Sequence, residues 1–483
     1  MIAAPNISFV ALLPMLILTG TALLALVADL WMEGPDREGL GWIGLAGLVA
    51  TAITAMTLWN THVSTLSDTL AVDRYGLFFT LLFCVVSALT LLMSMSYLET
   101  TEIQTGDYYS LVLFSTLGMV LMATATDLIV IFLGLEVMSI AAYALAGIAR
   151  SELRSNEAAL KYFLLGAFAS GFLLFGIALL YGATGHTALP QIAQRLTMVA
   201  GEQRLLVTAG MALLIVGFGF KVAAVPFHVW APDVYEGSPT SVTALMAVGI
   251  KAAAFAAFAR VFMHTLVIFS GDWTGVLWVL AVLTMTVGNV TALVQRNLKR
   301  MLAYSSIAHA GYLLVGMVAG GEAGGSAVLF YLIGYAFMTL GAFAVVIALG
   351  RRGQPNENLD DYNGVGFRSP FLGAAMAIFM LSLSGIPPLA GFVGKFYIFS
   401  AAVKSGYVGL AIIGVLNSVV SVYYYVGVLV RMYMTEGTTD VTAPSSRPYL
   451  FATLLLTMSG TILLGLFPSS LAEVARQSFL ALH

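Results

Sequence analysis

Four charged residues lie deep inside otherwise apolar stretches of the chain: Glu136, Lys221, Lys251 and Lys395. An ionisable group at the centre of a lipid bilayer costs roughly 2.5–3.5 kcal/mol on insertion scales, so such groups are rare and usually functional. A lysine in an apolar environment can hold or release a proton near neutral pH. The four residues therefore predict an ion or proton pathway.

The surroundings of each residue predict its role. Glu136, the ninth residue of LIVIFLGLEVMSIAAYAL, is the carboxylate expected at mid-depth, and we interpret it as the partner of Lys221. Making and breaking that pair would drive proton uptake and release. Lys251 stands at the centre of ALMAVGIKAAAFAAFA, too deep to reach either membrane surface, and is the expected central carrier. The alternatives are a static ion pair and a lysine satisfied by backbone carbonyl groups.

Lys395 is the corresponding lysine later in the chain. We expect it to connect the proton pathway to the far side of the membrane or to a neighbouring subunit. His228 and His309 are candidate proton relays, because imidazole titrates near neutral pH. Each of these histidines is equally well read as an interior histidine satisfied by its neighbours.

Prolines interrupt two of the apolar stretches beside a lysine. Pro226 follows Lys221 in GFGFKVAAVPFHVWAPDVYEGSPT, and Pro387 and Pro388 precede Lys395 in SLSGIPPLAGFVGKFYIF. Proline breaks the helical hydrogen-bond ladder, and the freed backbone groups inside a membrane must face protein or water. The two breaks predict two inverted repeats, each with one discontinuous helix lining a central site; the alternative is a pair of simple kinks.

Composition fixes the class of protein. Of 483 residues 60% are hydrophobic and only 9% are charged, which is typical of an all-α polytopic membrane protein. Fourteen stretches are long enough to cross a bilayer. They are 7–31, 40–60, 74–97, 108–125, 127–149, 158–182, 204–229, 239–264, 274–294, 300–319, 326–349, 371–402, 406–432 and 448–467. We divide the chain into an N-terminal three-helix segment, a first repeat of spans 4–8, a second repeat of spans 9–13, and a C-terminal helix and tail, which are residues 1–107, 108–270, 271–434 and 435–483.

The connecting segments differ in charge. Odd-numbered connections hold twelve lysines and arginines, including Arg351 and Arg352, and even-numbered connections with the C-terminal tail hold six, including Arg260. The positive-inside rule places the odd connections in the cytoplasm and both termini outside a bacterial plasma membrane. The net charge of −3 and the absence of a basic tract argue against nucleic-acid binding. The sequence holds one cysteine, Cys84, and no nucleotide, flavin, iron–sulfur or catalytic-metal motif, so we expect no cofactor in this chain.

The amino-acid sequences of four segments resemble those of the antiporter-like membrane subunits of respiratory complex I. These segments are SNEAALKYFLLGAFASG, FKVAAVPFHVWAPDVYEGSPT, QRNLKRMLAYSSIAHAGY and SLSGIPPLAGFVGKFYIF. The resemblance covers spans 4 through 13. The segment WAPDVYEGSP and a lysine rather than a glutamate at position 395 favour the N type of these subunits over the M type. The chain also lacks the long lateral helix of the L type.

The resemblance assigns the proton pathway to a glutamate on span 5 and lysines on spans 7, 8 and 12, which match Glu136, Lys221, Lys251 and Lys395. It implies that NADH-driven quinone reduction in other subunits is coupled to proton transfer here through two half-channels. NADH, flavin, iron–sulfur clusters and quinone are then expected in other subunits. The implied partners are M-like, K-like and J-like subunits, the lateral helix of an L-like subunit, and membrane lipid.

Three alternatives stay open at this point. The first is a subunit of a multi-subunit sodium/proton antiporter without redox partners. The second is a transporter of an organic solute, which would need a roomy cavity lined by groups specific to that solute. The third is a structural scaffold with vestigial charges.

Overall fold

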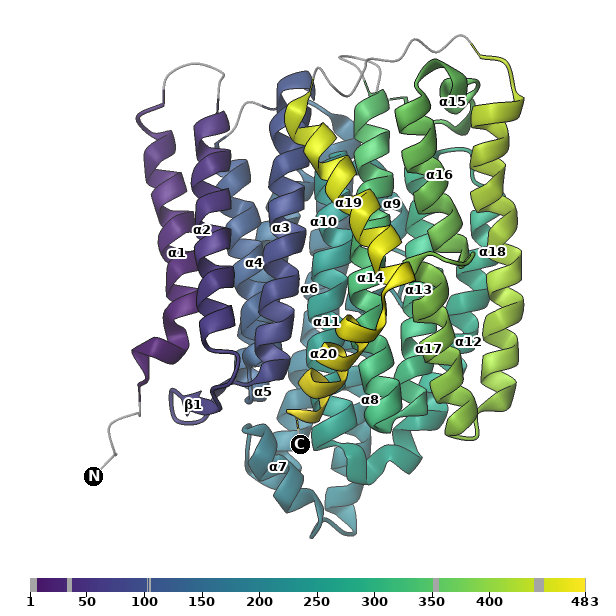
Figure 1. The fold of residues 1–483 in the computed structure, drawn as a ribbon. Helices are drawn as coiled ribbons and strands as arrows, with labels where there is room; N and C mark the ends of the chain where they lie inside the picture. Colours follow the sequence, from purple (N-terminus) through teal and green to yellow (C-terminus); the bar gives the residue numbers. More distant parts are fainter. Residues whose placement is uncertain are drawn as a thin grey trace.

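The computed structural model describes residues 7–32, 37–101, 103, 106–350, 356–437 and 447–482. Long helices run side by side in a bundle, and a short antiparallel hairpin, β1 (Val63–Thr65) paired with β2 (Leu70–Val72), lies at one end (Figure 1). The end of the bundle that carries this hairpin and the short helix α7 is called the hairpin face below. The opposite end is called the α9 face.

The first half of the chain contains α1 (Phe9–Asp29), α2 (Glu38–Thr57), α3 (Arg74–Thr101), α4 (Asp107–Thr124), α5 (Leu128–Ala146), α6 (Leu153–Thr184), α7 (Leu189–Leu196), α8 (Glu202–Val222), α9 (Ala231–Gly237), α10 (Thr240–Leu245), η1 (Met246–Ile250), α11 (Lys251–Ala259) and η2 (Arg260–Thr265). The second half contains η3 (Val267–Phe269), α12 (Ser270–Ala292), α13 (Leu298–Ala319), α14 (Gly321–Leu349), η4 (Leu359–Tyr362), α15 (Val365–Arg368), α16 (Pro370–Ser384), α17 (Ala390–Lys404), α18 (Val408–Met434), α19 (Pro448–Leu466) and α20 (Ser469–Leu480).

The predicted class, an all-α polytopic membrane protein, is confirmed. Within the described ranges, thirteen helical stretches are long and apolar enough to cross a membrane. The helices α16 and α17, 15 residues each, share the predicted span 371–402, so the stretches correspond to the fourteen predicted spans. The apolar window of the span Thr240–Thr265 is fully buried, whereas only 28% of that of α19 is buried. Lys251 therefore lies on the central span.

The two predicted interruptions occur beside the expected lysines. α8 ends at Val222, one residue after Lys221, and Ala223 adopts a left-handed conformation (φ 59°) that stops the helix. Seven further residues separate that position from α9. In the second case α16 ends at Ser384 with Gly385 (φ 88°) as its left-handed cap, and α17 begins at Ala390. The peptide bonds Val225–Pro226 and Pro387–Pro388 within the two breaks are cis.

The central span is not the regular helix that its sequence predicts. It contains two π-helical turns, η1 directly before Lys251 and η2 from Arg260 to its end. A π turn inserts one extra residue per turn and is often found at functional sites. The insertion changes the direction in which the residues after it face, so it decides where Lys251 points.

Both ends of the described chain lie at the hairpin face. The Ser8 amide donates to Thr65 Oγ1 of β1 (2.9 Å), and Arg74 at the start of α3 donates to Gln477 of α20 (3.4 Å). Arg260, which we had counted among the connecting segments, is instead buried within the central span. Arg351 and Arg352 lie outside the described residues.

Helices α4 and α5 pack so closely that a side chain at Gly118 would overlap with the facing backbone. A Cβ atom there would lie 2.3 Å from the Met138 amide nitrogen, and one at Gly134 would lie 2.9 Å from the Met122 nitrogen. Small residues permit such close helix contact in membranes. This contact fixes α5, and with it Glu136, against the rest of the bundle.

We expect Gly118→Ala to destabilise the folded protein by about 1–3 kcal/mol, because the added methyl group overpacks the contact. Thermal denaturation of the purified assembly measures the effect. Gly171→Ala on α6 is the matched control, since no heavy atom lies within 4 Å of a Cβ at that position. An equal melting temperature for the two variants would contradict the close packing.

Candidate functional site

Lys221 is enclosed by hydroxyl groups and aromatic rings. Its side chain, 3% exposed, extends from the last turn of α8 and donates to Ser139 Oγ (2.7 Å) and to the Tyr143 hydroxyl (3.4 Å), both on α5. The ammonium nitrogen also lies 5.3–5.9 Å from the centres of the Tyr143, Tyr162 and Phe220 rings. Aromatic faces attract cations, so the cage stabilises a charge in a place that water does not reach.

The expected direct pair between Glu136 and Lys221 is not formed among the described residues. Glu136 is half-buried on α5 and accepts a short hydrogen bond from Ser170 on α6. Ser139, one turn further along α5, takes the place against Lys221. Residues at i and i+3 share a helix face, so the carboxylate acts on the ammonium group from one turn away. The sequence placed the two charges on the right helices but could not give this offset.

Lys251 finds its acceptors on α13. Its side chain is 1% exposed and donates to the Ser306 carbonyl oxygen (2.6 Å) and to Ser306 Oγ. Ser306 lies within α13, where a hydroxyl side chain was unremarkable in the sequence. Lys251 thus lies between the two halves of the bundle: it belongs to the first half of the chain, and its hydrogen-bond acceptors belong to the second half.

Lys395 is solvated by the break in its own span. Its nitrogen donates to the carbonyl oxygens of Leu383 and Ser384 (both 3.0 Å) and to Ser418 Oγ on α18 (2.8 Å). The two carbonyls belong to the last turn of α16, where the helix leaves such groups without partners and carries partial negative charge. The ring of Tyr312 lies 4.9 Å away. The helix break therefore supplies what a carboxylate would otherwise supply.

His309 joins a group of buried tyrosines between Lys251 and Lys395. Its Nδ1 is hydrogen-bonded to the Tyr331 hydroxyl (2.5 Å) and its Nε2 to the Tyr425 hydroxyl (3.0 Å). Tyr425 is also hydrogen-bonded to Ser305, which neighbours Ser306 on α13. His309 thus has a contact on each side and lies one turn from the Lys251 acceptor.

A second polar segment adjoins the first through α18. Tyr424 donates to Asn289 Oδ1 (2.9 Å), and Asn289 Nδ2 donates to the Tyr312 hydroxyl (3.2 Å), whose ring lies against Lys395. Sequence reasoning missed these residues because tyrosine and asparagine are uncharged. The side chains are buried, but α12 and α18, which carry Asn289 and Tyr424, are only partly buried, so the burial of these two residues could not be read from their spans.

His228 lies elsewhere. It is half-buried in the first break, and its Nδ1 has no hydrogen-bond partner within the described part of the chain. Pro226, Pro387 and Pro388 are exposed at the surface of the bundle, so they shape the breaks and do not line the buried site. The described contacts thus connect His309, but not His228, to the groups around the buried lysines Lys251 and Lys395.

Comparison with known proteins decides the family. The model of the family described as NADH:quinone oxidoreductase/Mrp antiporter, TM matches residues 125–421. The chain is 48% identical to NADH-quinone oxidoreductase subunit N of Trichlorobacter lovleyi, over 98% of this chain and 97% of that protein. It is 44% identical to subunit N of Chloroflexus aggregans, over 99% and 98%. This chain belongs to the subunit N family.

Solved structures agree with that assignment. A chain of respiratory complex I from Thermus thermophilus has a TM-score of 0.80 and 35% identity, covering 95% of this chain and 98% of that one. A chain of the Mrp complex from Dietzia sp. DQ12-45-1b has a TM-score of 0.83 at 22% identity, covering 99% and 98%, and shares the fold. The family match spans every one of the four predicted site residues.

A charged cluster surrounds α9 in this subunit N family member. Asp233 pairs with Lys161 (2.7 Å) and Arg300 (2.8 Å), and Glu236 pairs with Arg300 (2.8 Å) and Arg154 (3.2 Å). Partial burial alone would raise the pKa of Asp233, but the hydrogen bonds from Lys161 and Arg300 outweigh burial and lower it. The cluster holds the segment after the first break against α6 and α13.

Lys299 at the start of α13 lies in the interior of the bundle. It is 2% exposed and pairs with Glu357 (3.0 Å) while donating to the Ser238 carbonyl oxygen (2.7 Å) at the end of α9. Neighbouring positions on a helix face different ways, so Arg300 reaches the partly exposed cluster and Lys299 reaches the interior.

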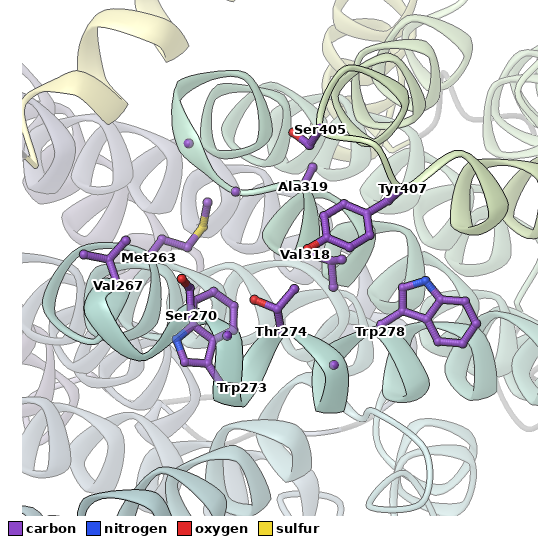
Figure 2. Close-up of a pocket in the computed structure, with 14 residues that line it drawn as sticks. Met263, Val267, Ser270, Trp273, Thr274, Trp278, Val318, Ala319, Ser405 and Tyr407 are labelled. Carbon is purple, nitrogen blue, oxygen red and sulfur yellow. The ribbon is translucent and has the colours of Figure 1, made fainter. Parts of the chain in front are cut away.

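Two large hollows and a smaller one of about 160 Å³ within the α9 charge cluster lie on the described surface of the bundle. One large hollow, of about 530 Å³ on the hairpin face, is lined by uncharged residues that include Trp273, Trp278 and Tyr407 (Figure 2). The other large hollow, of about 770 Å³ between α17 and α18, is mostly apolar and reaches Lys395. The first lies away from the buried lysines, and only the second approaches one of them.

We expect Ser139→Ala to lower the free energy of unfolding by roughly 1.5–3 kcal/mol, because a buried charge loses its shortest hydrogen bond. Ser115→Ala on α4 is the matched control: it is fully buried and contacts only the Met138 carbonyl, at 3.5 Å. Chemical denaturation of the purified assembly measures both variants. Equal losses would show that Ser139 does not support the Lys221 charge.

Proposed function

We propose that this chain is the proton-translocating membrane subunit N of a NADH–quinone oxidoreductase and that electron transfer takes place in other subunits. One observation carries the proposal. Lys221, Lys251 and Lys395 are each at most 4% exposed, yet none has a carboxylate within 4 Å among the described residues. Buried ammonium groups are costly unless paired, so their retention without counter-ions argues for groups that gain and lose a proton.

In this proposal a proton reaches Lys221 from the α9 face, passes to Lys251, and leaves toward Lys395. Glu136 sets the affinity of Lys221 from one helical turn away, Lys251 is the central carrier, and Lys395 connects to the far side or to a neighbour. His309 and Tyr425 relay between Lys251 on the central span and Lys395 beside the second break. A relay through hydroxyl and imidazole groups needs only short rotations, because each accepts on one side and donates on the other.

The finer arrangement belongs to the same proposal. Spans 4–8 and 9–13 form two inverted repeats, each with one broken helix and one half-channel. The α9 face is cytoplasmic and the hairpin face, with both chain ends, lies outside a bacterial plasma membrane. M-like, K-like and J-like subunits and the lateral helix of an L-like subunit are the neighbours, and NADH, flavin, iron–sulfur clusters and quinone bind to other subunits.

We expect Lys251→Met to remove most of the proton transfer through this subunit, because methionine has a similar length and cannot carry a proton. A barrier raised by about 1.4 kcal/mol already slows a step tenfold. NADH-driven acidification of vesicles that contain the assembled complex measures the effect. Lys404→Met, at the exposed end of α17, is the control and keeps the wild-type rate. Normal pumping by Lys251→Met would refute the assignment.

The sodium/proton antiporter is the second candidate, because the matching family model includes Mrp antiporters. A hydrated proton carrier needs no sodium, so we expect NADH-driven pumping to be unchanged when potassium or choline replaces sodium. A pH-sensitive dye and a sodium-sensitive dye in the same vesicles separate the two functions. Strict sodium dependence, or co-purification without redox subunits, would favour the antiporter.

A further inference from the structure

We infer that the buried ion pair between Asp73 and Arg260 closes the hairpin end of the central span to protons, so that a proton on Lys251 cannot leave in that direction. The inference rests on the proposed function, since it assumes that Lys251 carries protons. It assigns a role to two charged residues that the pathway itself does not use.

The pair is completed by protein groups on several sides. Arg260 and Asp73 are 4% and 7% exposed, and two hydrogen bonds of 2.9 and 3.1 Å join them. Arg260 also donates to the Ala123 carbonyl oxygen at the end of α4 (2.9 Å). The guanidinium carbon lies 4.9 Å from the centre of the ring of Tyr75, the second residue of α3. Both terminal nitrogens of the guanidinium group take part, and such an end-on, bidentate arginine–carboxylate pair is geometrically fixed.

The pair also joins three structural elements. Asp73 Oδ1 accepts from the Gly76 amide (2.6 Å) and so caps the start of α3. The Tyr75 hydroxyl donates to the Ala256 carbonyl oxygen of α11 (2.8 Å). Arg260 is the first residue of the π turn η2, so α3, the end of α4 and the central span are held together at one level.

The central span's own side chains between Lys251 and Arg260 carry no group that can bind a proton. This stretch reads AAAFAAFA, and each of these side chains is at most 1% exposed. The Phe258 ring is stacked on Phe218 with centres 5.0 Å apart. Nine residues of helix extend about 13 Å. An apolar layer of this depth is followed by the ion pair, and the short helix α7 covers η2 on the outside with its buried Leu189, Ile192 and Leu196.

The two directions available to a proton on Lys251 are therefore unequal. Toward α13 it meets Ser306, beside Ser305, Tyr425 and His309. Toward the hairpin face its own span presents methyl groups and phenyl rings, and a guanidinium group that is always charged follows them. The Tyr75 hydroxyl at this level already donates its proton to the Ala256 carbonyl oxygen (2.8 Å). A fixed guanidinium repels an excess proton, and its pairing with Asp73 keeps that carboxylate from serving as a proton acceptor.

The test compares passive proton leak with NADH-driven pumping in vesicles that contain the whole complex. In Arg260→Gln the Asp73 carboxylate is left buried and alone, which draws water toward it, so we expect the passive leak to rise roughly tenfold. Arg260→Lys keeps the charge but loses the second contact with Asp73, and we expect a smaller rise. Arg204→Gln breaks an exposed ion pair with Asp272 near the same face and should leave the leak unchanged.

The double variant Asp73→Leu with Arg260→Met separates closure from proton conduction. Apolar residues of similar size replace a buried ion pair well and leave no lone carboxylate, but they remove the fixed positive charge, so pumping is expected to stay near wild type and the leak to rise less than in Arg260→Gln. Loss of pumping without a leak in this variant would make the pair a proton carrier and overturn the inference. An unchanged leak in Arg260→Gln and Arg260→Lys would overturn it as well.

Failure of the proposed function would look different. Lys251→Met is measured in the same vesicles, and normal pumping by that variant would reject the carrier role whatever the Arg260 variants do. Lost pumping in Lys251→Met together with an unchanged leak in the Arg260 variants would reject only the closure.

Discussion

The structure is governed by the need to solvate ammonium groups inside an apolar bundle without placing carboxylates against them. A buried charge without partners is far costlier than the folded state can tolerate, so each lysine requires acceptors that the local backbone or neighbouring helices must provide. Lys221 uses a serine hydroxyl and aromatic rings, Lys251 a serine on α13, and Lys395 the open end of α16. The break after α16 serves this need directly, because the last turn of a helix leaves carbonyl groups without intrahelical partners.

The buried cations fall into two classes. Arg260 and Lys299, close to the ends of the bundle, are paired with Asp73 and Glu357. The three lysines at mid-depth have only neutral groups and, for Lys221, a carboxylate one turn away. Loss of a proton from a paired lysine would leave a carboxylate buried and alone, whereas loss from an unpaired lysine leaves a neutral amine. The second class can therefore change its charge at a lower cost than the first.

The sequence was sufficient for the residues and insufficient for their contacts. Charge within apolar stretches identified Glu136, Lys221, Lys251 and Lys395, and proline identified both breaks, because each is a local chemical signal. The offset between Glu136 and Lys221 depends on how α5 and α8 face each other, which helical periodicity alone does not fix. The π turn before Lys251 has no residue signature in MAVGI. Asn289 and Tyr425 went unnoticed because their types are ordinary in membrane helices, and their importance comes from the burial of their side chains.

The separation of the two classes has a consequence for the bundle as a whole. The ion pairs that hold α9 and the hairpin end lie at the two faces, while the neutral-solvated lysines lie between them. Ser306 and the tyrosines near it are the groups that surround Lys251 when its charge changes, and none of them takes part in those ion pairs. In the proposed pathway, charge moves along the middle of the bundle while the pairs that fix its helices stay intact. A bundle that used the same ion pairs for both purposes would have to loosen its own packing at each step, since breaking a buried pair is strongly destabilising.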